Sequence, residues 1–524
     1  MTPLEVLALY PAHDGTIPAA IAARVAVAGE RDCVVFEGQS WSWASFADLA
    51  ARAAGYLEAQ GVHHGDRVAL VARNSDAHVL LLFALARLGA ILVPINPALT
   101  PAESSYVLDL VEPVLVFHDG VDLPPPTSWR GVLWDAAVIA DIDAAAPKLV
   151  AANVTSDDIC LIIMTSGTTG FPKGVMHSQK SFLACGEGFV QRMHLQPTER
   201  MLVVLPLFHV NALFYSVAGA LAAGCSLIIA ARFSASGFWQ LVRDTGPTEV
   251  NMIEAMGSIL ANRPREEFRP GHALRKAYGV RSHSEKVFRE EFGVQDIVVG
   301  FGMTEAPGAI ANPFDGLRKS GSMGVLGRHP DPALPWTEAR IVDDNFVDVG
   351  VDEVGELVLR TPVQMRGYWR DEAQTEAAFR DGWFCSGDLV RRDADGFFFF
   401  VSRKKDIIRR RGENIAGAEL DRVVGQHPAV QEAAAIPVPS DLGEDEILIV
   451  AVPRAGAGVT EREIADWCAV HLAAHKVPRY VLLASELPHT PTHKVAKTVL
   501  RADPTLKSRA VDLAATTGQG TRGV

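Results

Sequence analysis

Short apolar runs alternate with segments of helical periodicity along the first three hundred residues of the chain. Residues 75–89 start with Ser-Asp, repeat their apolar side chains at helical spacing and stop at Gly89, so they predict a helix. Strands that alternate with helices form largely parallel sheets that are covered on both faces. The predicted strands are 67–72, 90–95, 115–119, 159–164, 201–206, 226–230 and 296–302.

One uncharged stretch, residues 211–231, is about as long as a helix that spans a bilayer. Its residues AAGCS, however, divide it into a helix-like half and a short strand-like run, LIIA. A buried helix that leads into a buried strand accounts for this pattern better than a membrane span does. We therefore predict no transmembrane segment and assign the stretch to the core.

The pattern changes after about residue 320. Residues 338–360 have the pattern of strand, turn and strand, with acidic residues and glycines in the turn, which indicates a small β-barrel-like unit over about 320–400. Further strand-like runs and one helix-like segment follow beyond Lys405, where we place a domain boundary. The sequence thus predicts a large, multi-layer α/β domain with parallel-rich sheets over 1–404, a small, mobile α+β domain over 405–510, and a tail at 511–524.

The totals agree with several domains, since 524 residues exceed what one hydrophobic core holds. A formal net charge of −13 argues against a nucleic-acid-binding protein, so an anionic ligand needs local positive charge. The six cysteines are scattered, which favours reduced thiols in a cytoplasmic protein, and the N-terminus lacks the pattern of a signal peptide.

Residues 164–178, MTSGTTGFPKGVMHS, are rich in Gly, Ser and Thr and follow a predicted buried strand. They fail the Walker pattern, because Gly167 precedes Lys173 by six residues and Gly174 follows the lysine. Such a loop can still wrap anionic oxygens with its backbone N–H groups and hydroxyls. The alternative is a flexible connector, and composition alone does not decide between the two.

Five motifs in a fixed order make the chain similar to a known superfamily. They are TSGTTGFPKG (165–174), FGMTE (301–305), WFCSGDL (383–389), SRKKDIIRRRGENI (402–415) and LPHTPTHKVAK (487–497). Together they span most of the chain and resemble the signatures of adenylate-forming enzymes. That superfamily contains acyl-CoA synthetases, luciferases and the adenylation domains of peptide synthetases.

The resemblance implies a reaction in two steps. A carboxylate attacks the α-phosphate of ATP, which releases pyrophosphate and leaves an acyl-adenylate. A thiol, usually that of CoA, then displaces AMP. Both steps gather negative charge in one site, so cations and oriented donors should dominate catalysis.

The resemblance also implies roles for residues of the first two motifs. Thr304 would contact the α-phosphate, and Glu305 would hold Mg²⁺, a cation that suits carboxylate and phosphate oxygens. Phe301 would form the aromatic wall of the ATP site beside Gly302 and Met303, where the family often has Tyr. The β- and γ-phosphates would be cradled by Thr165, Ser166, Gly167, Thr168, Thr169 and Lys173.

In the later motifs, Asp388 resembles the carboxylate that binds the ribose hydroxyls, and Arg403 the arginine that accompanies it. Lys405 matches the hinge between the domains, and Lys494 the catalytic lysine that bridges the substrate carboxylate and the α-phosphate. The chain departs from the family at Ser402 and His493, where relatives commonly have Gly. Lys497 is the alternative to Lys494, although its spacing fits less well.

Six of the nine residues from Arg403 to Arg411 are Lys or Arg. A run of like charges is often a solvated face. In an acidic chain, next to a family segment that lines the pantetheine tunnel, it also predicts a patch for the phosphates of CoA. The residues expected to bind CoA are Arg411, Gly412 and Glu413.

The acyl pocket is the least defined part of the predicted site. Residues 206–216, PLFHVNALFYS, resemble the segment that borders the acyl group, so His209 either lines the pocket or is a satisfied core histidine. Ala255, Gly257 and Gly308 are small and suggest room for a sizeable apolar acid. Details of residues 206–216 and of FGMTEAPG lean toward carnitine-CoA-ligase-like members.

The first hypothesis is therefore an ATP- and Mg²⁺-dependent ligase that joins a carboxylic acid, a small-molecule substrate, to CoA. The second is an enzyme that loads a carrier protein, or a luciferase-like oxygenase that uses the same adenylate. The third is a catalytically silent homologue, against which the intact motif residues speak. Monomer and homodimer both remain open.

Overall fold

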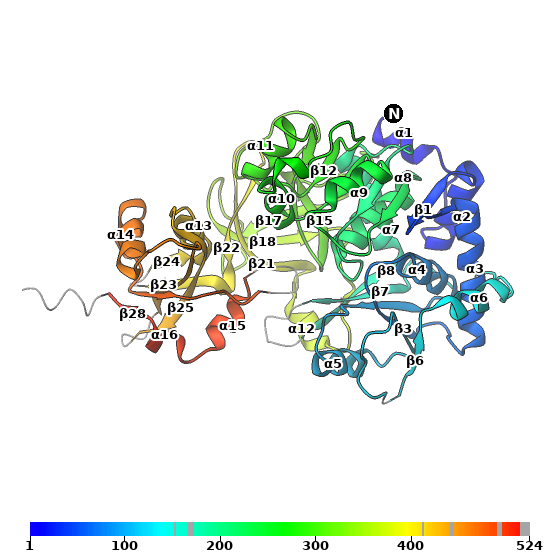
Figure 1. Ribbon diagram of the computed structural model, residues 1–524, viewed down its shortest axis with the longest axis horizontal. Helices are drawn as coiled ribbons and strands as arrows, with labels where there is room; N and C mark the ends of the chain where they lie inside the picture. The colour runs from blue at the N-terminus through cyan, green and yellow to red at the C-terminus, as the bar shows by residue number, and fades with distance from the viewer. Residues whose placement is uncertain are drawn as a thin grey trace, which may run out of the picture. The chain divides into compact units, whose positions relative to one another are not determined.

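The structure, a computed structural model, describes residues 1–126, 128–150, 153–165, 172–410, 413–440, 445–489 and 495–513 (Figure 1). Within these ranges the chain divides into two compact units. The first contains residues up to 339 and residues 359–384, and the second contains 340–358 and 385–513. Lys405 lies inside the second unit, and the domain boundary placed there stays a prediction.

The first seven-stranded sheet of the first unit is parallel except at one edge, where β1 and β2 are antiparallel. Its inner parallel strands are buried almost throughout, as expected for parallel strands that helices cover on both faces, whereas the antiparallel edge strand β2 has no buried residue. In spatial order they are β13 (Asp296–Val298), β12 (Lys276–Tyr278), β11 (Glu249–Asn251), β9 (Arg200–Val203), β10 (Ser226–Ile229), β1 (Asp32–Phe36) and β2 (Gln39–Ser42).

The second seven-stranded sheet is parallel from β7 to β6, and β8 and β19 extend it in antiparallel pairing. The predicted strands in this half of the chain are confirmed to within a few residues at each end. The order is β19 (Gly367–Tyr368), β8 (Lys173–Ser178), β7 (Ile159–Thr165), β4 (Ile91–Ile95), β3 (Arg67–Val71), β5 (Leu115–His118) and β6 (Arg130–Leu133).

Helices pack on these sheets and form a large apolar core and a smaller second apolar cluster with them (Figure 1). The predicted helix is confirmed as α4 (Asp76–Leu88), which ends at Gly89 with φ of 68°, a left-handed conformation that glycine adopts without a steric penalty. The others in this unit are α1 (Pro3–Ala8), α2 (Ile17–Ala28), α3 (Trp43–Ala59), α5 (Pro101–Val111), α6 (Ala136–Ala144), α7 (Gln179–Met193), α9 (Phe238–Thr245), α10 (Glu254–Ala261), α11 (Ser282–Glu290), α12 (Glu372–Ala377) and the short 3₁₀ turn η2 (Arg265–Glu267).

The uncharged stretch at 211–231 is core, as predicted. It forms a π-helix, η1 (Asn211–Val217), then α8 (Ala218–Ala223), and then strand β10, with nearly all its side chains buried. In the described part of the chain, no helix combines the length and the apolar character that crossing a membrane would require.

Two smaller sheets follow, in the region predicted as β-barrel-like and just before it. The three-stranded sheet carries the FGMTE motif at its first turn. Its order is β14 (Gly300–Met303), β15 (Ala306–Ala311) and β16 (Val325–Leu326). The five-stranded sheet has the order β17 (Glu338–Val342), β18 (Gly355–Arg360), β21 (Trp383–Arg392) and β20 (Phe379–Arg380), and β22 (Phe398–Arg403) pairs with β21.

The remainder of the second unit is α+β, as predicted, with its own apolar clusters. Helix α14 (Glu461–His471) starts with a capping box formed by Thr460 and Glu463. Its other elements are the hairpin β23 (Ile407–Arg410) and β24 (Glu413–Ala416), the sheet β25 (Val430–Pro439), β26 (Asp445–Pro453), β27 (Tyr480–Leu483) and β28 (Val511–Asp512), the helices α13 (Gly417–Gly425), α15 (Lys497–Ala502) and α16 (Leu506–Arg509), and the 3₁₀ turns η3 (Lys404–Asp406) and η4 (Ala474–Lys476).

Candidate active site

The Gly/Ser/Thr-rich loop connects two antiparallel strands, β7 and β8. Thr165 and Lys173 are cross-strand partners at its two ends, and the Thr165 hydroxyl lies 3.5 Å from the Lys173 carbonyl oxygen. The loop therefore leads into a strand, unlike a Walker loop, which leads into a helix. Its remaining predicted phosphate ligands, Ser166, Gly167, Thr168 and Thr169, lie outside the described residues.

Lys173 is held beside two residues from a distant part of the chain. Its ammonium group donates a hydrogen bond to Oε1 of Gln374 and lies 4.8 Å from the centre of the Tyr368 ring. Strand β19 brings Tyr368 there, because Tyr368 pairs with Val175 of β8. The face of an aromatic ring attracts a cation, so Tyr368 helps to position the Lys173 ammonium group.

Tyr368 also connects this lysine to Glu305. Its hydroxyl donates to Oε1 of Glu305 at 2.9 Å, and the Met365 amide donates to the Glu305 carbonyl at 2.8 Å. Burial raises the pKa of Tyr368, and the Glu305 carboxylate raises it further, so the hydroxyl stays protonated and remains a donor. The loop lysine and the FGMTE carboxylate thus belong to one local network.

The surroundings of Glu305 suit Mg²⁺. Tyr368 occupies one carboxylate oxygen, and the side chain is only half-buried, so the second oxygen can bind a cation. Mg²⁺ typically uses one or two carboxylates together with substrate phosphates and water. Among the described residues, no cluster of three or more His, Cys, Asp or Glu side chains forms a complete metal cage.

Thr304 is fixed through its backbone by a buried histidine. The ring nitrogen Nε2 of His177 lies 2.7 Å from the Thr304 carbonyl oxygen and must donate to it. Burial lowers the pKa of His177 to about 4, so the ring is neutral near pH 7 and carries its proton on Nε2. The His177 ring lies 4.6 Å from the Phe214 ring of the π-helix, which completes its packing.

Phe301, Gly302 and Met303 form strand β14 next to Thr304. Phe301 and Met303 are half-buried, while Gly302 is exposed. A Cβ on Gly302 would lie 2.5 Å from the Gly308 amide nitrogen and 2.8 Å from the Tyr215 hydroxyl. Only glycine fits at this close approach.

His209 precedes the π-helix at the end of a buried loop. Its ring is half-buried, 4.5 Å from the ring of Phe208. The buried Asn74 amide fixes the loop, since it donates to the Leu205 carbonyl at 2.9 Å and accepts from the Leu207 amide at 2.8 Å. A π-helix is rare and often marks a functional site, so His209 remains a candidate for the acyl pocket.

The second unit contains the predicted ribose site. Asp388 and Arg403 are cross-strand neighbours in β21 and β22, and Nε of Arg403 lies 2.5 Å from Oδ1 of Asp388. The Asp388 side chain is fully buried and that of Arg403 is 40% exposed. A carboxylate so placed needs positive charge or hydrogen-bond donors around it.

Neighbouring residues fix the segment of strand β21 before Asp388. The Ser386 hydroxyl donates to the Leu357 carbonyl at 2.6 Å, and the Gly387 amide donates to Glu356 at 3.1 Å. Lys404 in turn contacts Glu356 at 3.0 Å. The SGDL sequence is therefore a braced segment of strand β21 that places its aspartate next to Arg403.

The basic run from Arg403 to Arg411 is less positive in the fold than in the sequence. Arg403 pairs with Asp388, Lys404 with Asp344 and Glu356, and Arg410 with Glu446 in a buried ion pair at 2.7 Å. Of the residues predicted to bind CoA, Arg411 and Gly412 lie outside the described residues, and only the strand position of Glu413 is described. The backbone at Lys405 is a 3₁₀ turn.

The predicted catalytic lysine, Lys494, and its neighbour His493 also lie outside the described residues. The described residues on either side, His489 and Val495, form an antiparallel bridge. The alternative, Lys497, forms an ion pair with Asp421 at 2.5 Å, and its side chain is 13% exposed. Lys497 is thus engaged in the packing of the second unit.

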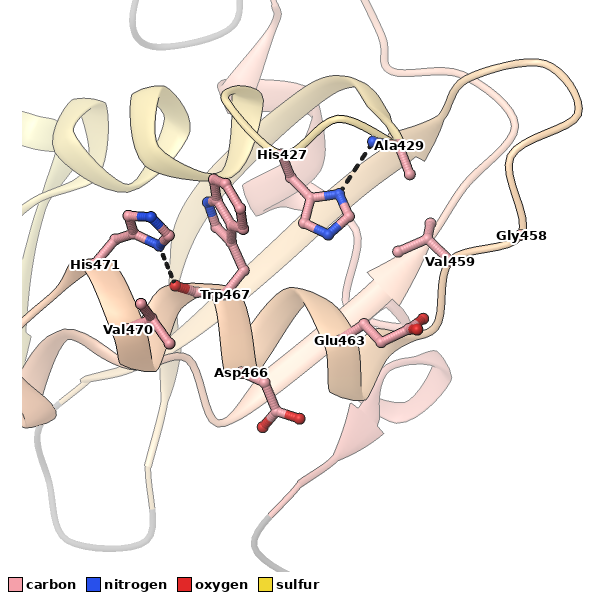
Figure 2. A pocket seen from close by; sticks show the side chains of 9 residues that line it. All are labelled: His427, Ala429, Gly458, Val459, Glu463, Asp466, Trp467, Val470 and His471. Carbon is pink, nitrogen blue, oxygen red and sulfur yellow. Dashed lines mark hydrogen bonds between the residues drawn. The ribbon is translucent and has the colours of Figure 1, made fainter.

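A pocket of about 490 Å³ lies against α14 and contains none of the predicted site residues (Figure 2). Trp467 forms its base, with Nε1 bonded to the Val423 carbonyl at 2.8 Å and the His471 ring 4.1 Å away. Figure 2 shows His427 on the other side of the indole. None of the residues that line this pocket belongs to the five motifs.

The sequence prediction missed His177, Tyr368 and Gln374. Tyr368 lies in GYW, a short aromatic run after a glycine, which was the one local signal available. His177 sits inside the quoted loop segment, but nothing in its immediate sequence marks it as a partner of Thr304.

Comparison with known proteins decides the family. The AMP-binding enzyme family matches residues 21–369, well over half of the chain, and the AMP-binding enzyme C-terminal domain matches residues 419–494. The chain belongs to the AMP-binding enzyme family. Within it, the chain is an AMP-forming acid–thiol ligase of the acyl-CoA synthetase branch, as the five motifs predicted.

Three relatives illustrate the range of the family. The sulfoacetate–CoA ligase of Cupriavidus necator is 31% identical over 503 residues, which cover 92% of this chain and 96% of the relative. The long-chain-fatty-acid–CoA ligase FadD13 of Mycobacterium tuberculosis is 30% identical over 485 residues, 88% of this chain and 92% of the relative. The crotonobetaine/carnitine–CoA ligase of Salmonella paratyphi A is 27% identical over 515 residues, which cover 91% of this chain and 96% of the relative.

Solved structures confirm the fold class. ATP-bound MatB from Rhodopseudomonas palustris matches with a TM-score of 0.80 at 25% identity, over 96% of this chain and 98% of that one. A fatty acyl-CoA synthetase of Mycobacterium tuberculosis matches with a TM-score of 0.74 at 28% identity, over 93% and 98%. The predicted α/β architecture is that of this enzyme family.

Proposed function

We propose that the protein activates a carboxylic acid with ATP and transfers the acyl group to CoA. One observation carries the proposal: Tyr368 links the ammonium of Lys173 to the carboxylate of Glu305, which joins the phosphate loop to the FGMTE motif. A cation for leaving phosphates and a carboxylate for a metal ion are thus close together. This is what the release of pyrophosphate requires.

In the first step, an oxygen of the acid forms a bond to the α-phosphorus while the bond to pyrophosphate breaks. Lys173 would bind the departing phosphates, and Thr304, held by His177, would contact the α-phosphate. Glu305 would hold Mg²⁺, which supplies positive charge to the phosphate oxygens. Asp388 would bind the ribose hydroxyls.

In the second step, the CoA sulfur attacks the acyl carbon and AMP leaves. We propose that Arg411, Gly412 and Glu413 border the CoA path and that Lys494 acts in the first step by bridging the acid and the α-phosphate. Lys405 is proposed as the hinge between the two half-reactions.

Pyrophosphate release tests this function. The protein is incubated with ATP, Mg²⁺ and a panel of acids, with and without CoA, and the panel includes sulfoacetate, a long-chain fatty acid and carnitine, the acids named for relatives. We expect acid-dependent pyrophosphate release and a CoA thioester. Adenylate without thioester would contradict CoA as the acceptor and favour a carrier protein, and no turnover with any acid would favour a silent homologue.

A further inference from the structure

The last turn of α7 places a cation behind the wall of the proposed acyl site. Arg192 is 8% exposed, and its Nη2 donates to the Gly308 carbonyl at 2.6 Å. Gly308 lies three residues beyond Glu305, and its φ is 68°. A Cβ on Gly308 would overlap the guanidinium, so Arg192 fills the space that the sequence suggested was left for an acyl chain.

The charge of Arg192 has no anionic partner among the described residues. Its Nη1 is buried and makes no hydrogen bond within that part of the chain. Three aromatic rings surround the guanidinium, with their centres 5.4 Å (Tyr215) and 5.7 Å (Phe189 and Tyr278) from Cζ, and the arginine also donates to the neutral Tyr278 hydroxyl. Such contacts offset part of the desolvation of a buried cation, while an unpaired buried charge costs several kcal/mol.

Another buried arginine of the same unit shows how this chain satisfies such a group when it is structural. Arg24 is 4% exposed and lies 3.9 Å from the Tyr10 ring. It donates to the Leu221 and Ala222 carbonyls at 2.7 and 2.9 Å, and none of its nitrogens is both buried and unpartnered in the described structure. Arg192 differs from Arg24 in keeping one donor unused.

The unused donor lies near the exposed edge of the FGMTE hairpin. Tyr215 is 5% exposed, its ring stacks on Phe189 at 5.3 Å, and its hydroxyl reaches the Cβ position of the exposed Gly302. Going inward from Gly302, the next groups are therefore the Tyr215 hydroxyl, the Gly308 backbone and the Arg192 guanidinium. This end of the site is polar and cationic, which suits a charged group better than a methyl group.

We infer that the acyl site takes a short carboxylic acid with a second anionic group, a carboxylate or a sulfonate, which binds Nη1 of Arg192 and the hydroxyl of Tyr215. The inference rests on the proposed function and names its substrate class. Guanidinium groups form strong, charge-assisted hydrogen bonds with such oxyanions. Bound there, the second group would supply the partner that the buried cation lacks.

Matched acids test this inference with the full-length chain. Acid-dependent exchange of pyrophosphate into ATP is measured with succinate and 3-sulfopropanoate against butanoate and pentanoate. We expect kcat/KM for at least one of the two doubly charged acids to exceed that for the methyl-ended acids by about tenfold to a hundredfold, the usual effect of a charged hydrogen bond. Comparable values for both kinds of acid would overturn the inference.

Variants test whether Arg192 and Tyr215 cause the preference for doubly charged acids. Arg192→Met should raise KM for the doubly charged acid by about tenfold or more with a smaller change in kcat, and Arg192→Lys should restore part of the loss. Tyr215→Phe, which keeps the ring and its packing, should raise the same KM. If Arg192→Met does not fold, this variant still tests the inference. Arg24→Met is the control and should leave the ratio between the acids unchanged.

The outcomes also separate this inference from the proposed function. Exchange with methyl-ended acids and none with doubly charged ones would overturn the inference alone, as would an unchanged preference in both Arg192→Met and Tyr215→Phe. Exchange with no acid at all would overturn the proposed function itself.

Discussion

His177 offers a direct test of how the site is positioned, because it couples a buried proton to the FGMTE motif. Replacement by leucine removes the donor to the Thr304 carbonyl, whereas replacement by glutamine can keep a donor near the position of Nε2. The unpaired carbonyl should cost about 1–3 kcal/mol of stability. A displacement of Thr304 by even about 1 Å can lower the rate about a hundredfold.

The pKa of His177 also predicts how the free energy of unfolding depends on pH. Burial lowers the pKa of His177 from 6.5 to about 4, so the folded state stays neutral where the unfolded chain already binds a proton. The contribution of His177 to the free energy of unfolding is therefore fully present above about pH 6.5 and is lost as the pH falls toward 4. One such histidine loses about 2 kcal/mol between pH 7 and pH 5, and about 3 kcal/mol by pH 4.

His78 is the matched control. It is fully buried in α4, and burial also lowers its pKa to about 4. His78→Leu should remove the same pH-dependent loss and leave kcat close to that of the wild type. His177→Leu should remove it too, but with kcat lower by about tenfold to a hundredfold, and His177→Gln should lie between.

Urea denaturation at pH 7, 6 and 5, together with pyrophosphate exchange at pH 7.5, checks both effects. If His177→Leu keeps wild-type kcat, the histidine does not position Thr304. If its stability falls with pH as steeply as that of the wild type, the ring is not held neutral in the fold.

Three further outcomes are expected. Asp388→Asn should raise KM for ATP by about tenfold or more and change KM for the acid little, as initial rates will show; equal changes would contradict its role at the ribose. Glu249 is fully buried and burial raises its pKa, so its burial costs more as the pH rises above 4.5. Glu249→Gln should therefore gain stability over the wild type in urea denaturation, and more so at pH 8 than at pH 5; a constant difference would refute this. Lys494→Ala should slow adenylate formation about 10²–10³-fold and affect thioester formation from supplied adenylate far less, while Lys497→Ala should not separate the two steps.

Local patterns predicted the elements of the fold well. The helix that ends at Gly89 has a start signal, a period and a stop signal, all within fifteen residues. Residues 211–217 were placed in the core, but their π-helical form was not foreseen, because uniformly apolar residues carry no periodic signal. Strand β19 consists of two residues and depends entirely on its pairing with β8, which no local pattern encodes.

The candidate site was predictable where its residues lie in contiguous motifs and not where they meet by folding. The contacts from His177 to Thr304, from Lys173 to Gln374 and from Arg192 to Gly308 join residues 127, 201 and 116 positions apart. No pattern in a single sequence reports such pairs.

The basic run from Arg403 to Arg411 was visible in the sequence, but its net charge in the fold was not. Its cations were visible in the sequence, but the anions that neutralise Arg403, Lys404 and Arg410 come from other elements, so the net field could not be judged from the run alone.

An oxygen-tracing experiment tests the central claim, that the acid is activated by attack on the α-phosphate of ATP. The preferred acid is labelled with ¹⁸O in its carboxylate and turned over with ATP, Mg²⁺ and CoA, and the products are analysed by mass spectrometry. We predict one ¹⁸O atom in AMP, none in pyrophosphate, and a thioester that keeps the other labelled oxygen. Label in pyrophosphate or inorganic phosphate, with none in AMP, would contradict the mechanism.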